Sequence, residues 1–177
     1  MDLDAFWRIV DDARSNAADD GVFLRRIAAR LRKLEPEGLI EFENQFEKLH
    51  TESCSWNLWG AAYLMNGGCS DDGFDYFRAW LMAQGRGPFE KAIEDADSLA
   101  EVADPEGGKS PRYHELETFM YLAREIYEEK TGEEMPESDS IFLEGVDQLD
   151  FDVRWNFDNA TEMKKRFPKL FTKYGRR

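Results

Sequence analysis

The fold is decided by the stretch Cys54-Ser-Trp-Asn-Leu-Trp-Gly-Ala-Ala-Tyr-Leu-Met-Asn-Gly-Gly-Cys69, continued by Ser70-Asp-Asp-Gly-Phe-Asp-Tyr-Phe-Arg-Ala-Trp-Leu-Met-Ala-Gln-Gly-Arg-Gly-Pro88. It contains three of the five Trp residues and both Cys residues. Apolar side chains recur at three- and four-residue steps on each side of a central Asn-Gly-Gly, a spacing typical of α-helices. The stretch therefore predicts two apolar helices joined by a tight corner. Because apolar residues cover much of the first helix, we expect the pair to lie at the centre of the molecule.

Both predicted helices have recognisable ends. The first covers about Ser55–Asn66 and stops at Gly67-Gly68, since glycine readily adopts the positive φ that ends many helices. Ser70 is a good N-cap for the second helix, which stops at Gly85 and Gly87-Pro88. The residues expected to face inward are Leu58, Ala62 and Met65 in the first helix, and Phe74, Phe77 and Leu81 in the second.

A set of residues in and around this stretch also matches the pattern of a known family. These residues are Leu58-Trp-x-Ala-Ala, then Gly-Gly-Cys-Ser-Asp-Asp-x-Phe-x-x-Phe-Arg-x-Trp-Leu-x-x-x-Gly-Arg86, together with Phe6-Trp7 and Asp97-Ser98-Leu99. On these residues the chain resembles DUF4240, a bacterial family of unknown function whose members are sometimes fused to WGR-type domains. The resemblance covers roughly residues 1–130. It implies a shared fold, but it brings no established activity and no catalytic residues.

Helical spacing recurs on both sides of the central pair. Further helices are expected over about residues 2–18, 21–34, 36–51, 88–93, 112–130 and 159–167. Two segments differ from this pattern: residues 104–111 form the clearest loop, and residues 149–153 alternate like a short extended piece. Leu170, Phe171 and Tyr174 are expected to dock after the break at Pro168.

Few strand patterns compete with these helices, so the expected class is all-α. We predict a single-domain compact multi-helix array over residues 1–177, with a central aromatic-rich helix pair. Within it, residues 1–130 form the core that resembles the family, and residues 131–177 form a C-terminal extension packed on that core. An aromatic content of 14% with 13 Phe is too rich for a disordered chain.

The sequence also indicates a location and a redox state. No apolar run approaches the roughly 18 to 20 residues of a membrane span, and the start Met-Asp-Leu-Asp lacks signal-peptide features, so a cytoplasmic location is expected. Cys54 and Cys69 flank the first central helix, which separates them by about 20 Å. A disulfide needs Cα atoms within about 7 Å, so two free and largely buried thiols are predicted.

The net charge of −14 is unevenly distributed. Residues 90–152 contain 20 acidic and 5 basic side chains, whereas the rest of the chain is close to neutral. Residues 162–177 are strongly basic. The whole chain should repel nucleic acid at long range, so no nucleic-acid partner is expected. The basic tail could touch phosphate, but we favour a role as an intramolecular partner of the acidic region or as a solvated segment.

Three carboxylates and one guanidinium gather at the start of the second central helix: Asp71, Asp72, Asp75 and Arg78. In a structural interpretation, Asp71 and Asp72 face the positive end of the helix dipole, and Asp75 pairs with Arg78. Alternatively, three carboxylates could hold Mg²⁺ or Ca²⁺, or two could act as acid and base. The spacing matches no calcium-loop pattern. We favour the structural interpretation and predict no metal site.

Other motifs are incomplete. His114-Glu-Leu-Glu-Thr118 begins like a zinc-protease helix, but Thr118 stands where the second His is required. No nucleophile elbow, phosphate loop or dinucleotide fingerprint occurs, so no cofactor is predicted. Gly85-Arg-Gly87 is a weak phosphate signal, and we expect Arg86 to bond to nearby carbonyls at a helix end. The aromatic stripe either forms a ligand cage or packs in the core, the usual outcome: Trp56, Trp59, Tyr63 and Trp80.

Two classes of function remain. The first is a non-catalytic bacterial binding or regulatory module that acts through contacts with a protein or a small ligand. The second is a metal-dependent enzyme that uses Asp71, Asp72 and Asp75. The absence of every familiar catalytic motif favours the first class, with no membrane partner. The candidate ligand- or partner-binding residues are Asp71, Asp72, Asp75, Arg78, Arg86 and Trp59.

Overall fold

The computed structural model describes residues 1–102, 114–137 and 154–175. The described residues are helical with no strand, which confirms the all-α class. The predicted loop at 104–111 and the predicted extended piece at 149–153 lie outside them. The elements are α1 (Leu3–Arg14), α2 (Asp20–Leu31), α3 (Pro36–Glu52), α4 (Trp56–Asn66), α5 (Asp71–Ala83), α6 (Arg86–Glu94), the 3-10 helix η1 (Ala96–Glu101), α7 (Glu117–Thr131), α8 (Ala160–Arg166) and α9 (Pro168–Tyr174).

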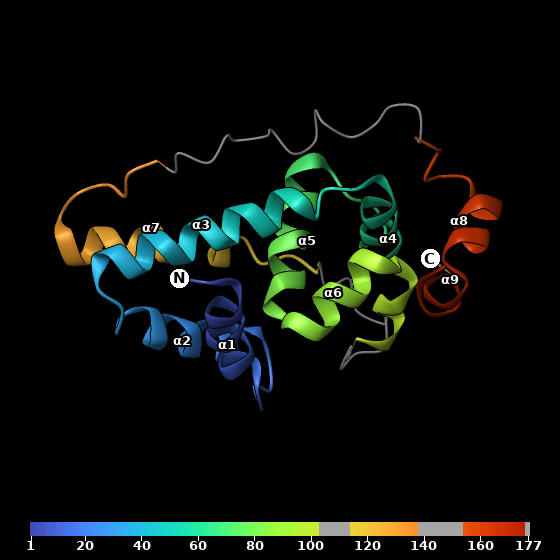
Figure 1. Ribbon diagram of the computed structural model, residues 1–177. Helices are drawn as coiled ribbons and strands as arrows, with labels where there is room; N and C mark the ends of the chain where they lie inside the picture. Colours follow the sequence, from blue (N-terminus) through green and yellow to red (C-terminus); the bar gives the residue numbers. More distant parts are fainter. Residues whose placement is uncertain (103–113, 138–153, 176–177) are drawn as a thin grey trace.

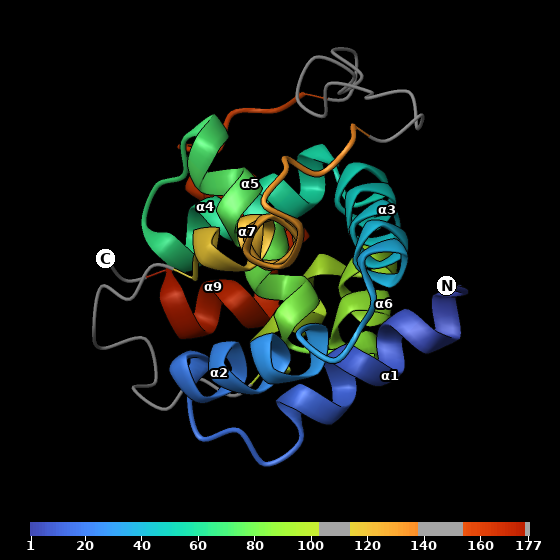
Figure 2. The same cartoon turned by 90° about the vertical axis from the view of Figure 1, so that its left-hand side faces the viewer.

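Helix α5 lies at the middle of the array, with α3, α4 and α6 around it (Figure 1). Figure 2 looks along α7, which packs between α3 and α5. Helices α1 and α2 lie beneath α3 and α7 in Figure 1, and α8 and α9 lie at the right-hand end, where α9 packs against α4. The prediction that the aromatic-rich pair is central is confirmed.

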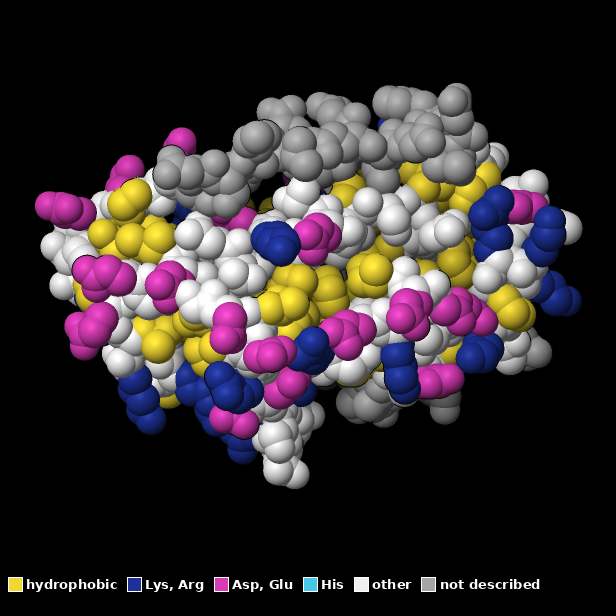
Figure 3. Space-filling model, viewed as in Figure 1, with side chains coloured by type: hydrophobic (Ala, Val, Ile, Leu, Met, Phe, Trp, Pro, Cys, Tyr) yellow, Lys and Arg dark blue, Asp and Glu magenta, His cyan; other side chains and the backbone are white. Residues whose placement is uncertain are grey.

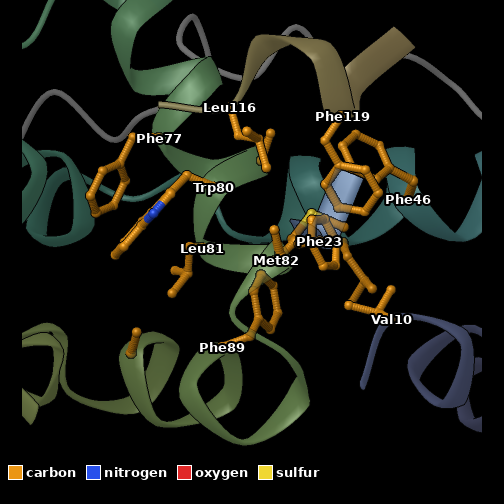
Figure 4. Close-up of a cluster of buried hydrophobic side chains, with 14 of the residues drawn as sticks. Val10, Phe23, Phe46, Phe77, Trp80, Leu81, Met82, Phe89, Leu116 and Phe119 are labelled. Atoms are coloured by element: carbon orange, nitrogen blue, oxygen red, sulfur yellow. The ribbon is translucent and has the colours of Figure 1, made fainter. Parts of the chain in front are cut away.

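The side chains of α5 fill the core because every residue from Phe77 to Ala83 is buried and all of them except Arg78 are apolar. Phe77, Leu81 and Met82 are fully buried, and Trp80 is 5% exposed. Figure 4 shows how side chains from α1, α2, α3, α6 and α7 converge on this helix. The core on the α3 side is aromatic, since Phe119 makes edge contacts with both Phe23 and Phe46. Each large side chain buried in this way contributes roughly 1.5 to 3 kcal/mol.

The corner between α4 and α5 forms as the local sequence predicts. The Ser55 hydroxyl accepts from the Leu58 N–H at 3.1 Å, and the Ser70 hydroxyl accepts from the Gly73 N–H at 3.1 Å. Gly67 ends α4 with φ 72°, a conformation that costs other residues energy. These two hydrogen bonds and the Gly67 turn are local, so the sequence near the corner is enough to place the ends of the two helices.

Three predicted helix boundaries are wrong. The helices expected over residues 2–18 and 21–34 end earlier, at Arg14 and Leu31, and the helix expected over residues 112–130 begins at Glu117, with residues 114–116 outside any helix. The His114 N–H donates to the Asn66 side chain at 2.8 Å, and the Leu116 N–H donates to the Tyr76 carbonyl at 3.0 Å. Because these two N–H groups find partners on α4 and α5, the segment gains nothing by forming a further helical turn.

The C-terminal segment, residues 154–175, packs against α4 and η1. The buried carboxylate of Asp97 accepts from the backbone N–H groups of Lys169 and Leu170 at 3.0 and 2.8 Å, so η1 caps the start of α9. On α4, the ring of Trp155 lies where a side chain at position 60 would be: a Cβ on Gly60 would come within 2.7 Å of it. The family core and the segment are therefore in intimate contact.

Replacing Gly60 by Ala is expected to loosen the C-terminal segment. Alanine favours a helix over glycine by about 1 kcal/mol, but the added methyl would overlap Trp155, and overpacking typically costs about 1 to 3 kcal/mol. Urea unfolding should show a net loss of stability, and limited proteolysis should cut residues 154–175 faster. Gly87→Ala is the matched control, since no atom lies within 4 Å of its Cβ, and it should be neutral or stabilising. A stabilised Gly60→Ala protein would contradict the observed docking.

Candidate functional site

A surface hollow of about 270 Å³ lies between α4 and the C-terminal segment. Tyr63 and Leu64 reach it from α4, and Gly67 borders it at the corner that follows. The other lining residues come from the C-terminal segment: Phe157, Asp158, Ala160, Met163, Phe171, Tyr174 and Gly175. Figure 3 shows hydrophobic side chains gathered at the end of the molecule where α4 and α8 lie, beside Lys and Arg side chains.

The aromatic residues that line this hollow pack against further aromatic rings. Phe157 stacks on Trp56 with ring centroids 4.6 Å apart and lies 5.4 Å from Tyr63. Trp59, a candidate site residue, does not line the hollow. Its ring stacks on Phe74 at 5.1 Å, and its indole N–H donates to the Cys69 carbonyl at 3.1 Å. Trp59 therefore holds the α4–α5 corner and carries the aromatic cluster that borders the hollow.

The predicted four-residue aromatic stripe is divided in the structure. Trp56, Trp59 and Tyr63 belong to the cluster around Phe157, whereas Trp80 packs into the core beside His114 at 4.7 Å. The stripe divides because Trp80 is on α5, whose inward face points away from the outer face of α4.

Asp158 gives the hollow its charge. Among the described residues that line the hollow, Asp158 is the one that carries a carboxylate, and none of the others is a Glu, His, Lys or Arg. Its carboxylate accepts a hydrogen bond from the Tyr63 hydroxyl at 2.6 Å. This bond favours the neutral phenol and raises the pKa of Tyr63. The pair fixes the carboxylate at the rim of the hollow.

Asp71 and Asp72 are exposed in the first turn of α5, next to the Ser70 cap. They stand in the predicted positions at the positive end of the helix dipole. Asp75 is directed differently, since it forms an ion pair with Arg78. The described residues contain no group of three or more His, Cys, Asp or Glu side chains that could hold a metal ion.

Asp71→Asn and Asp72→Asn are each expected to reduce the free energy of unfolding by about 0.3 to 1 kcal/mol. The loss arises because an anion near the helix N-terminus is removed, and salt should shrink it. Thermal melts in low and high salt, with chelator and with millimolar Mg²⁺ or Ca²⁺, measure it. A large metal-dependent stabilisation of the parent that both variants abolish would contradict this interpretation.

Arg78 belongs to a partly buried polar seam that runs along α3. The seam consists of two groups: Glu43 and Glu47 on α3 pair with Arg124 on α7, and His50 on α3 bonds to the Asp75 carbonyl and, through its own carbonyl, to Arg78 on α5, which pairs with the Asp75 carboxylate. The α3 members recur at four- and three-residue steps, so they share one face. Arg78 is only 2% exposed, and its guanidinium also donates to the His50 carbonyl at 2.5 Å and lies over the Phe74 ring.

Three members of the seam have displaced pKa values: Glu43, His50 and Arg124, whose pKa is lowered by burial but raised overall by the Glu43 and Glu47 carboxylates. Burial raises the pKa of Glu43 to about 7, although the pairing with Arg124 at 2.6 Å opposes the shift. Burial and the charge of Arg78 lower the pKa of His50 to about 4. The His50 Nε2 lies 3.0 Å from the Asp75 carbonyl, which can only accept, so Nε2 carries the proton of the neutral ring.

Arg86 contacts none of the other candidate residues in the described contacts. The prediction that it bonds to nearby carbonyls is wrong. Arg86 is the first residue of α6 and lies beyond the C-terminal end of α5, and its guanidinium bonds to Asp4 at 2.6 Å and Glu90 at 2.7 Å instead of to carbonyls. Its backbone N–H donates to Asp11 at 2.8 Å. The glycine before it, with φ 96°, turns the chain so that α6 starts at once. Arg86 therefore joins α1 to α6.

Neither Cys54 nor Cys69 forms a disulfide, as predicted, but both side chains are half-buried rather than largely buried. Burial and the nearby Glu115 carboxylate raise the pKa of Cys69 to about 12, so the thiol stays protonated at neutral pH. Burial also raises the pKa of Cys54. Neither environment favours a thiolate nucleophile.

Sequence reasoning identified part of the hollow. It expected Tyr63 in an aromatic group and expected Phe171 and Tyr174 to dock, but it did not single out Phe157, Asp158 or Met163. Helical spacing carries no information on which distant segment covers α4. The aromatic content of residues 154–157 is the one signal in the sequence that could have pointed to this contact.

None of the described helices is both long enough and apolar enough to span a membrane. Comparison with known proteins found no match among curated proteins and none among solved structures. A family model described as "Protein of unknown function (DUF4240)" matches residues 1–129. The match includes the α4–α5 pair and the polar seam, and it ends before the C-terminal segment. The chain therefore belongs to the DUF4240 family of proteins of unknown function.

Proposed function

We propose that this chain is a single-domain, non-catalytic binding module, and that its small organic ligand sits in the hollow between α4 and the C-terminal segment. The observation that carries the proposal is the lining of the hollow: aromatic rings from α4, α9 and the coil before α8 converge beside one fixed carboxylate. Small-molecule sites commonly combine apolar and aromatic walls with a few polar groups that orient the ligand.

The candidate residues on α5 support the hollow indirectly in this proposal. Asp71 and Asp72 stabilise the start of α5, and Arg78 ties α5 to α3. Trp59 stacks on α5 and holds the aromatic cluster. Since the hollow is formed partly by the family core and partly by residues 154–175, both parts are needed for binding.

The test is an NMR screen of the full chain with a panel of small organic acids, amines and uncharged compounds. At least one compound is expected to shift the backbone amide signals of Tyr63, Gly67 and Gly175 together in a saturable way. The blocking variant is Ala160→Trp, since Ala160 is exposed and lines the hollow, so a large side chain there fills it without removing a core contact.

The matched control is Thr161→Trp, which adds the same indole to the next exposed residue of α8, outside the lining. Binding should be lost in Ala160→Trp and retained in Thr161→Trp. If no compound in the panel shifts the three amides, or if binding survives Ala160→Trp, the proposed function is wrong.

A further inference from the structure

We infer that the ligand of the hollow is an organic cation of the alkylammonium class, of which a quaternary ammonium group is the simplest form. This inference rests on the proposed binding function and adds the chemistry of the ligand. Three observations support it. The walls of the hollow are aromatic, a carboxylate is held at its rim, and Lys173 and Arg166 form their hydrogen bonds outside its lining.

The aromatic walls come from two directions. Tyr63 extends from α4, and Phe171 and Tyr174 follow each other at a three-residue step on α9, so both α9 rings are on the side that borders the hollow. Phe157 lies against Tyr63 with centroids 5.4 Å apart. The face of an aromatic ring is electronegative, so several rings around one space favour a cation over an uncharged group of the same shape.

The carboxylate adds a full negative charge at the same place. The Tyr63 hydroxyl donates to Oδ1 of Asp158, and no described residue donates a hydrogen bond to Oδ2. Asp158 is exposed, so its charge is retained at little desolvation cost and can face a ligand directly. A carboxylic acid ligand would instead meet like charge, which disfavours anions in this hollow.

Two basic side chains of the C-terminal segment, Lys173 and Arg166, form their hydrogen bonds outside the lining of the hollow. Lys173 donates to the carbonyls of Ala100 and Val102 at 3.1 and 3.2 Å, and its ammonium lies 5.3 Å from the centroid of the Tyr174 ring, so that ring already faces a cation. Arg166 pairs with Glu162 at 2.8 Å and lies over the Trp155 ring. Neither side chain is part of the lining. The net charge of −14 for the whole chain also attracts cations at long range.

Choline and neohexanol, its uncharged carbon isostere, are the probes that test the class of ligand. Both are titrated into the labelled full chain at matched ionic strength, and the amides of Tyr63, Gly67 and Gly175 are followed. Choline is expected to shift them saturably, with an affinity about tenfold or more above that of neohexanol, the preference that about 1.4 kcal/mol of charge-dependent attraction produces.

Variants locate the charge that matters. Asp158→Asn should weaken choline binding about tenfold and leave neohexanol unchanged. Asp12→Asn removes the same charge from an exposed site on α1 and should leave choline binding unchanged. Tyr63→Phe keeps the Asp158 charge and a similar ring, so it should weaken choline binding less than Asp158→Asn does. This variant also shows whether loss of the Tyr63–Asp158 bond alone disturbs the fold.

The outcomes separate this inference from the proposed function. Equal affinities for choline and neohexanol, or equal choline affinities in Asp158→Asn and Asp12→Asn, would overturn the cation inference while the hollow remains a binding site. The same holds if choline does not bind but another compound of the panel shifts the three amides. If no compound shifts them, both the inference and the proposed function are wrong.

Discussion

In the Glu43→Gln variant, the free energy of unfolding should rise more steeply with pH than in the parent, by about 2 kcal/mol between pH 5 and pH 8. The folded-state pKa of Glu43 is raised from 4.5 to about 7, so the folded protein binds this proton more tightly than the unfolded chain does. The stability from this group is therefore complete below about pH 4.5, and it is lost as the pH rises through about 7. Glutamine resembles the protonated form and removes that loss.

His50 has the opposite effect over nearly the same range. Its folded-state pKa is lowered from 6.5 to about 4, so its contribution is complete above about pH 6.5 and is lost as the pH falls through 4. The two groups oppose each other in the parent, where their slopes nearly cancel. In Glu43→Gln, the contribution of His50 remains, so the free energy of unfolding rises with pH. In His50→Gln, the contribution of Glu43 remains, so the free energy of unfolding falls with pH.

Urea unfolding of the parent, both single variants and the double variant at several pH values measures these slopes. Only the difference between each variant and the parent is interpreted, because other carboxylates titrate in all four proteins. The double variant should follow the parent closely in its pH dependence. Parallel pH curves for Glu43→Gln and the parent would show that Glu43 ionises at its ordinary pKa and would contradict its burial in the polar seam.

Arg78→Met should be among the most destabilising single changes in this chain, with a loss of about 3 kcal/mol or more. Methionine fills much of the same space, but it removes one of the two donors to the His50 carbonyl, the other being the Ser53 hydroxyl, and it leaves Asp75 without its cation. Arg78 is 2% exposed, so water does not readily replace its bond to the His50 carbonyl, whereas the Asp75 carboxylate is 36% exposed and stays partly hydrated. Thermal and urea unfolding of the full chain measure the loss.

Arg166→Met is the matched control, because Arg166 also pairs with an acid in its own helix and also lies over an aromatic ring. Its side chain is 36% exposed, and surface pairs of this kind contribute about 0 to 1 kcal/mol. Adding Asp75→Asn to Arg78→Met should recover part of the loss by removing the unpaired carboxylate. Similar losses of unfolding free energy for Arg78→Met and Arg166→Met would show that the burial of Arg78 does not add to the stability of the protein.

The features that the sequence predicted well are those set by contacts between near neighbours. The caps at Ser55 and Ser70, the positive φ at Gly67 and the Asp75–Arg78 pair all involve residues at most three positions apart. Such contacts depend on residue type and spacing alone, and both can be read from the chain. For the same reason, the capping positions of Asp71 and Asp72 were predicted correctly.

The features that sequence reasoning missed depend on partners far along the chain. The start of α7 is delayed because Asn66 and Tyr76 capture the N–H groups of His114 and Leu116, and nothing local signals this. Arg86 bonds to Asp4, 82 residues earlier. The hollow is of the same kind, because Asp158 comes to Tyr63 only after residues 154–175 fold back onto α4.

The close approach of Trp155 to Gly60 also has an evolutionary consequence. The matched family region ends at residue 129, so position 60 lies inside this region and Trp155, whose ring restricts it, lies outside it. A family member that covers α4 with another segment, or leaves it open, is free to place alanine or a larger residue at this position. Across the family, a glycine at position 60 should therefore co-vary with a bulky aromatic residue at the position of Trp155.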